Sequence, residues 1–247
     1  MKADKLQSRL KSPPKRRNPP RPQKELFVIG NIHGCARQLG KILKQAPQSA
    51  QIIFIGDLMD LGPHSERVLK RVEKECANGA IALMGNHERM FLNFLENPGR
   101  AGPIWLRAGG EKTLDSFGIM GVTSLSSKLE LEYAANQLRS LIHRRTFRWL
   151  NSLAMQYDTG TVHVVHAAAC PNKPMHQQCE DVLLWGSKDF LTTQRADHEW
   201  IVHGDVIVKS PIKKLGRINI DTGAYRTGKL SAVHIHQAGQ DFLTVEQ

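Results

Sequence analysis

Three short blocks of the sequence carry the residue types best suited to hydrolytic chemistry, namely GNIHG at 30–34, GDLMD at 56–60 and GNHE at 85–88. Each block follows an apolar run that is typical of a buried strand. Together they supply His33, Asp57, Asn86 and His87 on successive loops. A site that holds two metal ions for phosphoester hydrolysis needs carboxylate and imidazole ligands from several strand ends. The blocks therefore predict a two-metal hydrolytic site.

The blocks contribute different types of metal ligand. Asn31 and His33 lie two residues apart, so both point to the same side if the strand continues past Gly30. Asp57, at the end of the next strand, could bridge both ions. Asn86 offers a neutral carbonyl oxygen. We expect all four side chains to contribute to the metal site.

Two later segments supply further ligand candidates. His166 follows the apolar run TVHVV, and an HGD segment at 203–205 follows another strand-like run. His203 and Asp205 lie two residues apart and could share one face of a strand, so spacing alone leaves both as candidates. A single histidine among apolar neighbours, such as His163, is more often structural. The prediction therefore rests on the ordered set of blocks.

His87 is the candidate general acid. It lies beside Asn86, where it could give a proton to a leaving alcohol. A carboxylate such as Asp60 could orient the imidazole and raise its pKa. The sequence thus predicts a catalytic pair made of His87 and Asp60.

The blocks lie in a regular alternation of elements. Between residues 25 and 96, short apolar runs alternate with amphipathic helical segments, which predicts parallel strands whose carboxyl ends form a crevice at the blocks. Residues 97–150 predict a helical insert, with helices at about 105–117 and 128–149. From residue 150 onward, strand-like runs through DFLTVE predict a second, largely antiparallel sheet.

Charge and length divide the chain into an arm and one domain. The 247 residues, 40% of them hydrophobic, fit a single α/β domain at 25–247. Residues 1–24 hold nine Lys or Arg and one Asp, so they carry +8 of the formal +11. This Pro-rich basic arm is expected to be disordered, most simply as a solvated tail, although it could contact anionic surfaces such as nucleic acid or phospholipid. Because the remainder carries only +3, a nucleic-acid-binding module is disfavoured.

Two further features bear on location. The sequence lacks an apolar stretch of the about 20 residues that a transmembrane helix needs, and its basic start is not followed by the apolar region of a secretory signal. The cysteines, Cys35, Cys76, Cys170 and Cys179, form no C-x-x-C pair and no disulfide framework. We expect reduced thiols in a cytoplasmic protein.

The ordered motifs resemble a known family. GNIHG, GDLMDLG, GNHE, VVHAA, IVHGD and INIDTGA, across about residues 25–235, are similar to the motifs of the phosphoprotein phosphatases within the calcineurin-like metallophosphoesterases. WLRAGGEKTLDSFG at 105–118 further resembles small bacterial members that act as serine/threonine phosphatases or dinucleoside polyphosphate hydrolases. The resemblance implies a four-layer α/β/β/α sandwich and two divalent metal ions, either manganese or a mixed iron/zinc pair. Because imidazole is scarcer than oxygen among the candidate ligands, we favour manganese.

Two metal-ligand positions depart from the family pattern. Asn31 stands where the family has a metal-binding aspartate, and Asp205 stands where it has a histidine. Asp57 and Asp205 keep the number of carboxylates at two, so metal binding remains expected. The same correspondence favours Asp205 over His203 as the ligand.

Two phosphate-binding positions depart as well. Leu61 and Ser187 stand where the family has arginines. Loss of one preorganised donor to a developing oxyanion typically costs about 10²–10³ in rate. Lys188 or Arg89 could compensate as substrate-binding residues, although lysine lacks the two-pronged guanidinium.

Two hypotheses follow from these departures. In the first, which we favour, the chain is a metal-dependent phosphoesterase of weakened activity that hydrolyses a phosphorylated protein or a small phosphoester. In the second, it is a catalytically impaired pseudophosphatase that acts as a binding scaffold.

Overall fold

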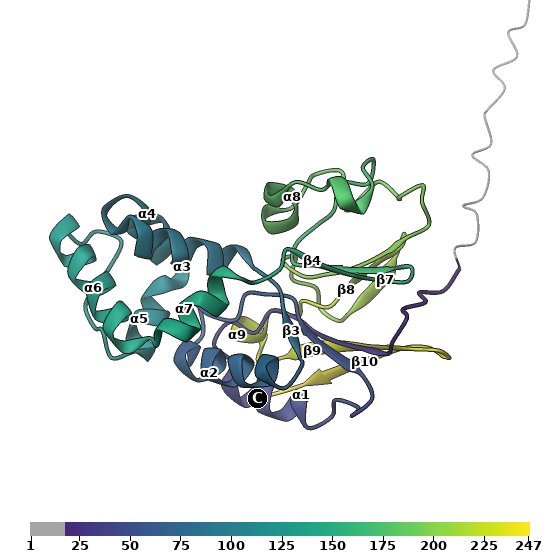
Figure 1. Ribbon diagram of the computed structural model, residues 1–247, viewed down its shortest axis with the longest axis horizontal. Coiled ribbons are helices and arrows are strands. Elements are labelled where there is room, and N and C mark those ends of the chain that lie inside the picture. The colour runs from purple at the N-terminus through teal and green to yellow at the C-terminus, as the bar shows by residue number, and fades with distance from the viewer. Residues whose placement is uncertain (1–17) are drawn as a thin grey trace, which may run out of the picture.

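The computed structural model describes residues 18–247, so most of the predicted disordered arm, residues 1–17, lies outside the described residues. The described chain forms two five-stranded sheets that pack face to face (Figure 1). Helices cover the outer face of each sheet. The four-layer α/β/β/α sandwich predicted from the motifs is confirmed.

The first sheet has the strand order β10-β9-β1-β2-β3. Its strands are β1 (Leu26–Ile29), β2 (Gln51–Phe54), β3 (Ile81–Ala82), β9 (Leu230–His236) and β10 (Gly239–Val245). The β1–β2 and β2–β3 pairs are parallel, as predicted. Strand β9 pairs antiparallel with β1, and β10 pairs antiparallel with β9.

The second sheet has the order β4-β5-β6-β8-β7. Its strands are β4 (Gln156–Thr159), β5 (Val162–Val165), β6 (Trp200–His203), β7 (Ile212–Lys214) and β8 (Arg217–Asn219). Its three central strands are parallel, and only the edge strands run antiparallel to their neighbours. The prediction of a largely antiparallel second sheet that included the last two runs was therefore wrong. Alternation of apolar residues identifies a strand, but it does not identify the partner or direction of that strand.

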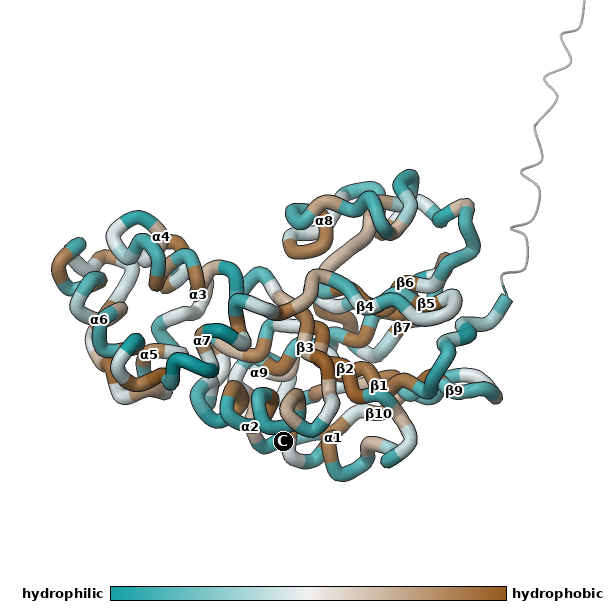
Figure 2. The backbone as a smooth tube through the Cα atoms, in the orientation of Figure 1, coloured by the Kyte–Doolittle hydropathy of each residue, from teal (hydrophilic) through white to brown (hydrophobic). Residues whose placement is uncertain are grey.

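Apolar faces explain how the layers pack. Between the sheets lie alternate residues of both, including Val28, Ile53, Val164 and Val202. Figure 2 shows this apolar core along β1, β2 and β3. Helices α1 (Ala36–Leu43) and α2 (Ser65–Ala77) cover the outer face of the first sheet, and α8 (Glu180–Trp185) covers the second.

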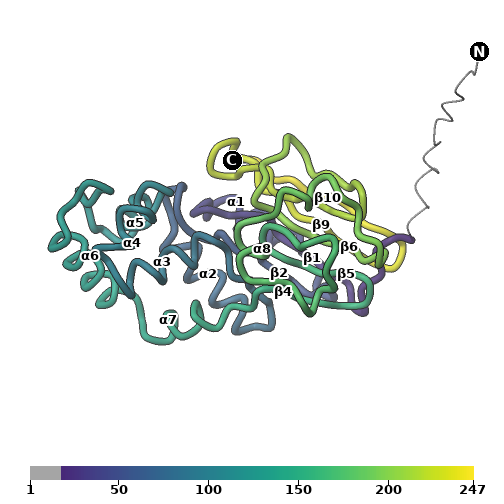
Figure 3. Tube along the Cα trace, turned by 90° about the horizontal axis from the view of Figure 1, so that it is seen from above, coloured from purple at the N-terminus to yellow at the C-terminus, as the bar shows by residue number. Residues whose placement is uncertain are grey.

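A helical group projects to one side of the sandwich (Figures 1 and 3). It consists of α3 (Asn86–Glu96), α4 (Pro98–Trp105), a π-helical turn (Leu106–Gly110), α5 (Glu111–Ser116), α6 (Lys128–Leu141) and α7 (Arg144–Asn151). The single helix predicted at 128–149 is broken at His143, whose side chain accepts a hydrogen bond from the backbone N–H of Arg145 and caps α7. Buried Trp105 anchors the group, because its ring stacks on Phe94 at a centroid distance of 4.6 Å.

Three connecting regions complete the fold. A 3₁₀ turn (Met175–Gln177) precedes α8, and the short helix α9 (Ala224–Thr227) follows β8.

Residues 18–24, for which the sequence predicted disorder, are hydrogen-bonded to the β4–β5 hairpin. Arg21 and Thr161 exchange hydrogen bonds of 3.0 Å, and the Trp200 indole donates to the Asn18 carbonyl at 2.8 Å. Within residues 18–247, no helix is long and apolar enough to cross a membrane.

Candidate metal centre

Backbone hydrogen bonds join the loops after β1 and β2, and the loop after β3 lies close against them. The N–H groups of Ile32 and His33 both donate to the Asp57 carbonyl, at 3.0 and 2.8 Å. Asp57 and His33 have positive φ angles of 51° and 44°, which are costly for residues with a side chain. Gly85 is required here because a Cβ at this position would lie 2.4 Å from Asp57 Oδ1. The glycine-bounded blocks thus allow the loops to approach closely.

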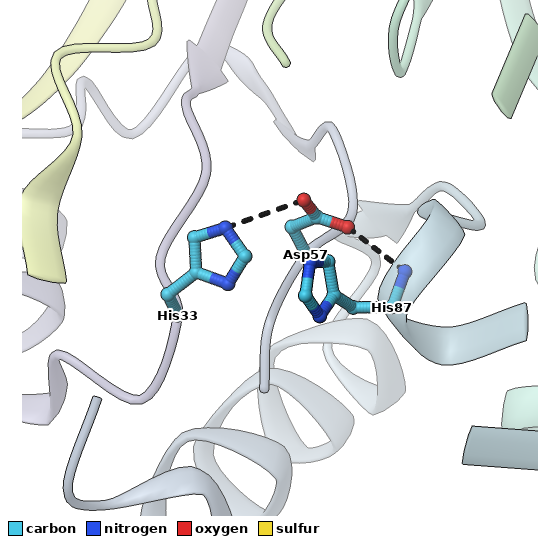
Figure 4. Close-up of side chains that lie close together, drawn as sticks. All are labelled: His33, Asp57 and His87. Carbon is cyan, nitrogen blue, oxygen red and sulfur yellow. Dashed lines mark hydrogen bonds and ion pairs between the residues drawn. The ribbon is translucent and has the colours of Figure 1, made fainter. Parts of the chain in front are cut away.

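Asp57 lies at the centre of the site. Its Oδ2 is 3.3 Å from His33 Nε2, and its Oδ1 is 3.4 Å from His166 Nε2. Figure 4 shows Asp57 between the His33 ring and the backbone nitrogen of His87, which donates to Oδ1 at 3.2 Å. Burial alone would raise the pKa of Asp57, but His166, His87 and His33 outweigh it and hold that pKa well below its usual range. Asp57 is therefore an anion that faces two imidazoles.

Unsatisfied lone pairs around Asp57 fit a bound cation. His33 and His166 each direct Nδ1 at a backbone carbonyl, Met59 at 2.9 Å and Ile55 at 2.8 Å, which leaves both Nε2 atoms facing Asp57. Within residues 18–247, buried His166 Nε2 has no hydrogen-bond partner, and the same is true of Asn86 Oδ1. A buried acceptor without a partner is costly, and a metal ion would satisfy both atoms.

The potential ligands form two groups that share Asp57. One group joins Asp57 to His33 and His87, and the other joins it to His166 and Asp205. Within each group the potential ligand atoms lie within 4.8 Å of one another. Of the two residues left open by spacing, the structure brings Asp205 and not His203 into a ligand group.

Both asparagines predicted as ligands lie at this centre. Asn31 Nδ2 donates to Asp57 Oδ2 at 3.0 Å, and Asn31 Oδ1 accepts from the Asp205 N–H at 3.4 Å. Asn86 Nδ2 donates to Asp205 Oδ1 at 3.3 Å. Asn31 is thus present as a hydrogen-bond partner of the central carboxylate, whereas Asn86 has a free carbonyl oxygen.

The predicted pair of His87 and Asp60 is also brought together. His87 Nδ1 lies 2.8 Å from Asp60 Oδ2. Buried Asp60 also accepts hydrogen bonds from the Trp105 indole at 2.8 Å and the Thr113 hydroxyl at 2.6 Å. Burial would lower the pKa of His87, but Asp57 and the hydrogen bond with Asp60 outweigh it and raise that pKa to about 9. A protonated His87 is a suitable proton donor.

Several residues of the site were not predicted. Trp105 and Thr113 come from the helical group, and the only signal was the segment at 105–118 that carried the family resemblance. Buried Glu88, inside GNHE, accepts from the N–H groups of Asp57, Leu58 and Gly85 at 2.8–3.0 Å and so ties two loops together.

Asp221 is another buried acid that was not predicted as a site residue. It lies in the INIDTGA motif, and burial, as the largest cause, raises its pKa to about 6. The neighbouring Tyr225 ring meets the His33 ring edge-on at 5.2 Å.

The wall formed by the second sheet contains the expected substrate-binding positions. The cavity beside Asp205 measures about 320 Å³. Ser187, Lys188 and Trp185 line it with Asp205. Arg89 instead forms an ion pair with Glu180 and lines a different cavity. Lys188 is therefore the better placed of the two predicted phosphate-binding residues.

The two remaining positions discussed from the sequence, His203 and Leu61, make contacts with other parts of the fold. His203 is buried against Phe190 at a centroid distance of 4.8 Å, and burial lowers its pKa to about 4. Leu61 donates from its N–H to the Gly109 carbonyl at 3.2 Å and so contacts the π-helical turn. Neither residue supplies a positive charge at the centre.

Comparisons with known proteins show the family and the fold of this chain. The sequence profile of the family described as calcineurin-like phosphoesterase matches residues 25–209. Serine/threonine-protein phosphatase 1 of Salmonella typhimurium is 28% identical over 223 residues, which cover 86% of this chain and 92% of that protein. An asymmetrical bis(5'-nucleosyl)-tetraphosphatase, PrpE, of Oceanobacillus iheyensis is 25% identical over 251 residues, which cover 90% of this chain and 92% of that protein. A crystal structure assigned to a diadenosine tetraphosphatase has a TM-score of 0.63 at 21% identity, covers 92% of this chain and 95% of its own, and shows a shared fold.

Proposed function

The chain belongs to the calcineurin-like phosphoesterase family, and from this premise we propose that it is a metal-dependent phosphomonoesterase. The observation that carries the proposal is buried Asp57, which lies 3.3 Å from His33 and 3.4 Å from His166. The unsatisfied His166 Nε2 and Asn86 Oδ1 beside it support a cation at this place.

The proposed ligands divide between two ions. His33 and Asp57, with Asn31 beside them, would hold the first ion, and Asp57, Asn86, His166 and Asp205 would hold the second. When bound, two divalent ions polarise a phosphoryl oxygen and lower the pKa of water. We propose manganese, with iron and zinc as alternatives, because oxygen atoms outnumber imidazoles in this set.

The chain's own groups complete the proposed reaction. Attack of water forms a new bond from oxygen to phosphorus and breaks the bond from phosphorus to the alcohol oxygen, and His87 gives that oxygen its proton. The attacking water releases one proton to solvent, and His87 regains one from solvent before the next turnover. Asp60 holds the His87 ring through the 2.8 Å contact. Lys188 would supply positive charge to the phosphate from the cavity beside Asp205.

The substrate is proposed at the level of chemical class. A phosphorylated protein or a small phosphoester fits the names of the relatives, which include a serine/threonine-protein phosphatase and a dinucleoside tetraphosphatase. We further propose that residues 25–247 form the catalytic domain, with the helical insert at about 97–150. Free cysteines at four positions support a reducing compartment, and we propose the cytoplasm. Contact of the basic arm, residues 1–24, with anionic surfaces remains a proposal.

Hydrolysis of p-nitrophenyl phosphate by the purified full chain tests the proposal. We expect turnover that depends on added Mn²⁺ and falls to the blank rate in Asp57→Asn, which keeps the size of the side chain but removes its charge. If Asp57→Asn hydrolyses p-nitrophenyl phosphate as fast as the wild type, the activity comes from a contaminating phosphatase, and this result would contradict the proposal.

A second candidate is a pseudophosphatase scaffold that binds phosphorylated ligands without turnover. Leu61 and Ser187, which stand at the family's arginine positions, favour it. Binding of inorganic phosphate to the Mn²⁺-loaded chain, together with absence of hydrolysis above the Asp57→Asn rate, would support this candidate over the enzyme.

A further inference from the structure

A second group of potential metal ligands lies at the β9–β10 hairpin of the first sheet. His234 and His236 end β9, and Asp241 lies on β10 after the hairpin turn. One potential ligand atom from each of these residues lies within 4.8 Å of the others. Figure 1 shows this β9–β10 hairpin extending away from the helical group.

Strand register places these three side chains and Glu25 on one face. Asp241 pairs directly with His234, and Phe27 of β1 pairs with His234 from the other side. Because side chains alternate along a strand, Glu25 shares the face of Phe27, and His236 shares the face of His234. Glu25, His234, His236 and Asp241 therefore come from three neighbouring strands and point to the same side.

The distances join the group through its imidazoles. His236 Nε2 is 2.9 Å from Asp241 Oδ2, and His234 Nε2 is 3.5 Å from Glu25 Oε2. The His234 and His236 ring centroids are 4.8 Å apart. In a tetrahedral zinc site with bonds of about 2.0–2.1 Å, ligand atoms lie about 3.3 Å apart. Among His234, His236 and Asp241, whose potential ligand atoms lie within 4.8 Å of one another, adjustments of up to about 1.5 Å would reach this separation.

One imidazole nitrogen of the group has only a long contact. Among the described residues, buried His234 Nε2 finds no hydrogen-bond partner, and it lies 3.5 Å from the Glu25 carboxylate in a long ion pair. Two neutral imidazoles and two carboxylates would balance the charge of a divalent cation. By contrast, His163 places its two ring nitrogens on separate carboxylates, at 2.6 Å from Asp158 and 2.9 Å from Glu199. His163 is thus satisfied by hydrogen bonds alone.

We propose that Glu25, His234, His236 and Asp241 form an accessory binding site for one zinc ion. The site is separate from the candidate metal centre, because Phe27 and Asn31 are four residues apart on an extended chain, which spans about 13 Å. Bound zinc would link the residue preceding β1 to the β9–β10 hairpin. Glu25 directly follows residues 18–24, so the ion would also hold the segment that carries the basic arm.

Zinc binding to the untagged full chain, after chelator treatment, tests the proposal. The number of Zn²⁺ ions bound per chain is measured by isothermal titration for the wild type, His236→Gln, Asp241→Asn and the matched control His163→Gln. We expect one ion fewer in His236→Gln and at least tenfold weaker binding of that ion in Asp241→Asn. His163→Gln also removes a surface imidazole between two carboxylates, and we expect it to bind as many ions as the wild type.

The outcomes separate this site from the proposed catalytic function. Asp57→Asn should keep the ion that His236→Gln loses, and His236→Gln should keep Mn²⁺-dependent hydrolysis. Zinc should raise the melting temperature of Asp57→Asn but not that of Asp57→Asn combined with His236→Gln. Equal zinc stoichiometry and affinity in the wild type, His236→Gln and Asp241→Asn would overturn the proposal and leave these residues as ordinary surface ion pairs.

Discussion

The two walls of the candidate metal centre differ in how firmly they hold their side chains. On the wall of the first sheet, Asp57 and Asp60 are 2% and 0% exposed, and each accepts several hydrogen bonds. On the wall of the second sheet, the Asp205 side chain is 28% exposed and lines a cavity with Ser187 and Lys188. The first wall holds the proposed central ligand, Asp57, and the proposed proton donor His87, whereas the second wall contributes the proposed ligands His166 and Asp205 and the proposed substrate-binding residue Lys188. The departures in phosphate contacts lie on both walls, Leu61 on the first and Ser187 on the second, whereas the proposed proton-transfer pair of His87 and Asp60 is retained.

The largest effect is expected on the first wall. His87→Ala should lower the turnover number by about 10²–10⁴-fold, because general-acid catalysis typically contributes that much. His87 belongs to the group of potential ligands with His33 and Asp57, but its Nδ1 contacts Asp60 and we assign it as the proton donor, so metal content should stay unchanged. Steady-state kinetics with p-nitrophenyl phosphate and metal analysis measure the two quantities. Wild-type turnover in His87→Ala would refute the assignment of His87 as the general acid.

Repair of the substituted positions should produce the next largest effect. The combined variant Asn31→Asp, Leu61→Arg and Asp205→His should raise kcat/KM by about 10²-fold, because one restored donor is worth about 10²–10³. Leu61 contacts the π-helical turn through the Gly109 carbonyl at 3.2 Å, so the longer side chain must extend past this turn. The control is Asn31→Asp with Asp205→His, which repairs only the metal ligands. No gain in the triple variant would show that other residues of the cleft, beyond these three, have also diverged from the family pattern.

A smaller effect tests how the helical group supports the first wall. Trp105→Phe keeps an aromatic ring against Phe94 but removes the donor to Asp60. Loss of one hydrogen-bond donor to the buried Asp60 carboxylate should lower the unfolding free energy by about 1–3 kcal/mol. Urea unfolding and turnover are measured together. Trp149→Phe, in α7, is the control, and equal stability of Trp105→Phe and the wild type would show that the indole donor is dispensable.

The smallest effect concerns the second sheet away from the centre. Burial would lower the pKa of His163, but hydrogen bonds to Asp158 and Glu199 outweigh it and raise that pKa. The folded protein therefore holds this proton more tightly than the unfolded chain, whose histidine pKa is about 6.5. The resulting stability is fully present below that value and is lost as pH rises through the folded pKa.

His163→Gln should thus lower the unfolding free energy by at most about 1 kcal/mol at acidic pH, because exposed pairs contribute little. At alkaline pH the effect of charge should vanish. Urea unfolding of the wild type and His163→Gln, from acidic to alkaline pH, measures the difference in unfolding free energy. A loss that grows with rising pH would contradict the sign given above.

The sequence predicted the residues that parallel strands bring together. His33, Asp57 and Asn86 follow strands whose carboxyl ends meet at one edge, so their proximity follows from strand direction alone. The contact between Trp105 and Asp60 depends on how the helical group packs, and the sequence pattern contains no measure of that packing. Arg89 forms an ion pair with Glu180, which lies on α8, and local spacing cannot reveal such a distant partner.

Strand partners show the same limit. The runs that form β9 and β10 were recognised as strands, but they were assigned to the wrong sheet. Their apolar alternation fits either sheet, and pairing with β1 is fixed by the packing of the whole sandwich. The ligands His234 and Asp241 come together only through this pairing.

The number of Mn²⁺ ions bound at the candidate centre tests most directly whether the chain holds a two-metal site. Isothermal titration with Mn²⁺ is performed on two chains that both carry His236→Gln, one with Asp57 intact and the other with Asp57→Asn. We predict two bound ions with Asp57 intact and loss of both with Asp57→Asn, because this carboxylate belongs to both ligand groups. Equal binding by the two chains, or no binding by either, would contradict the proposed two-metal centre.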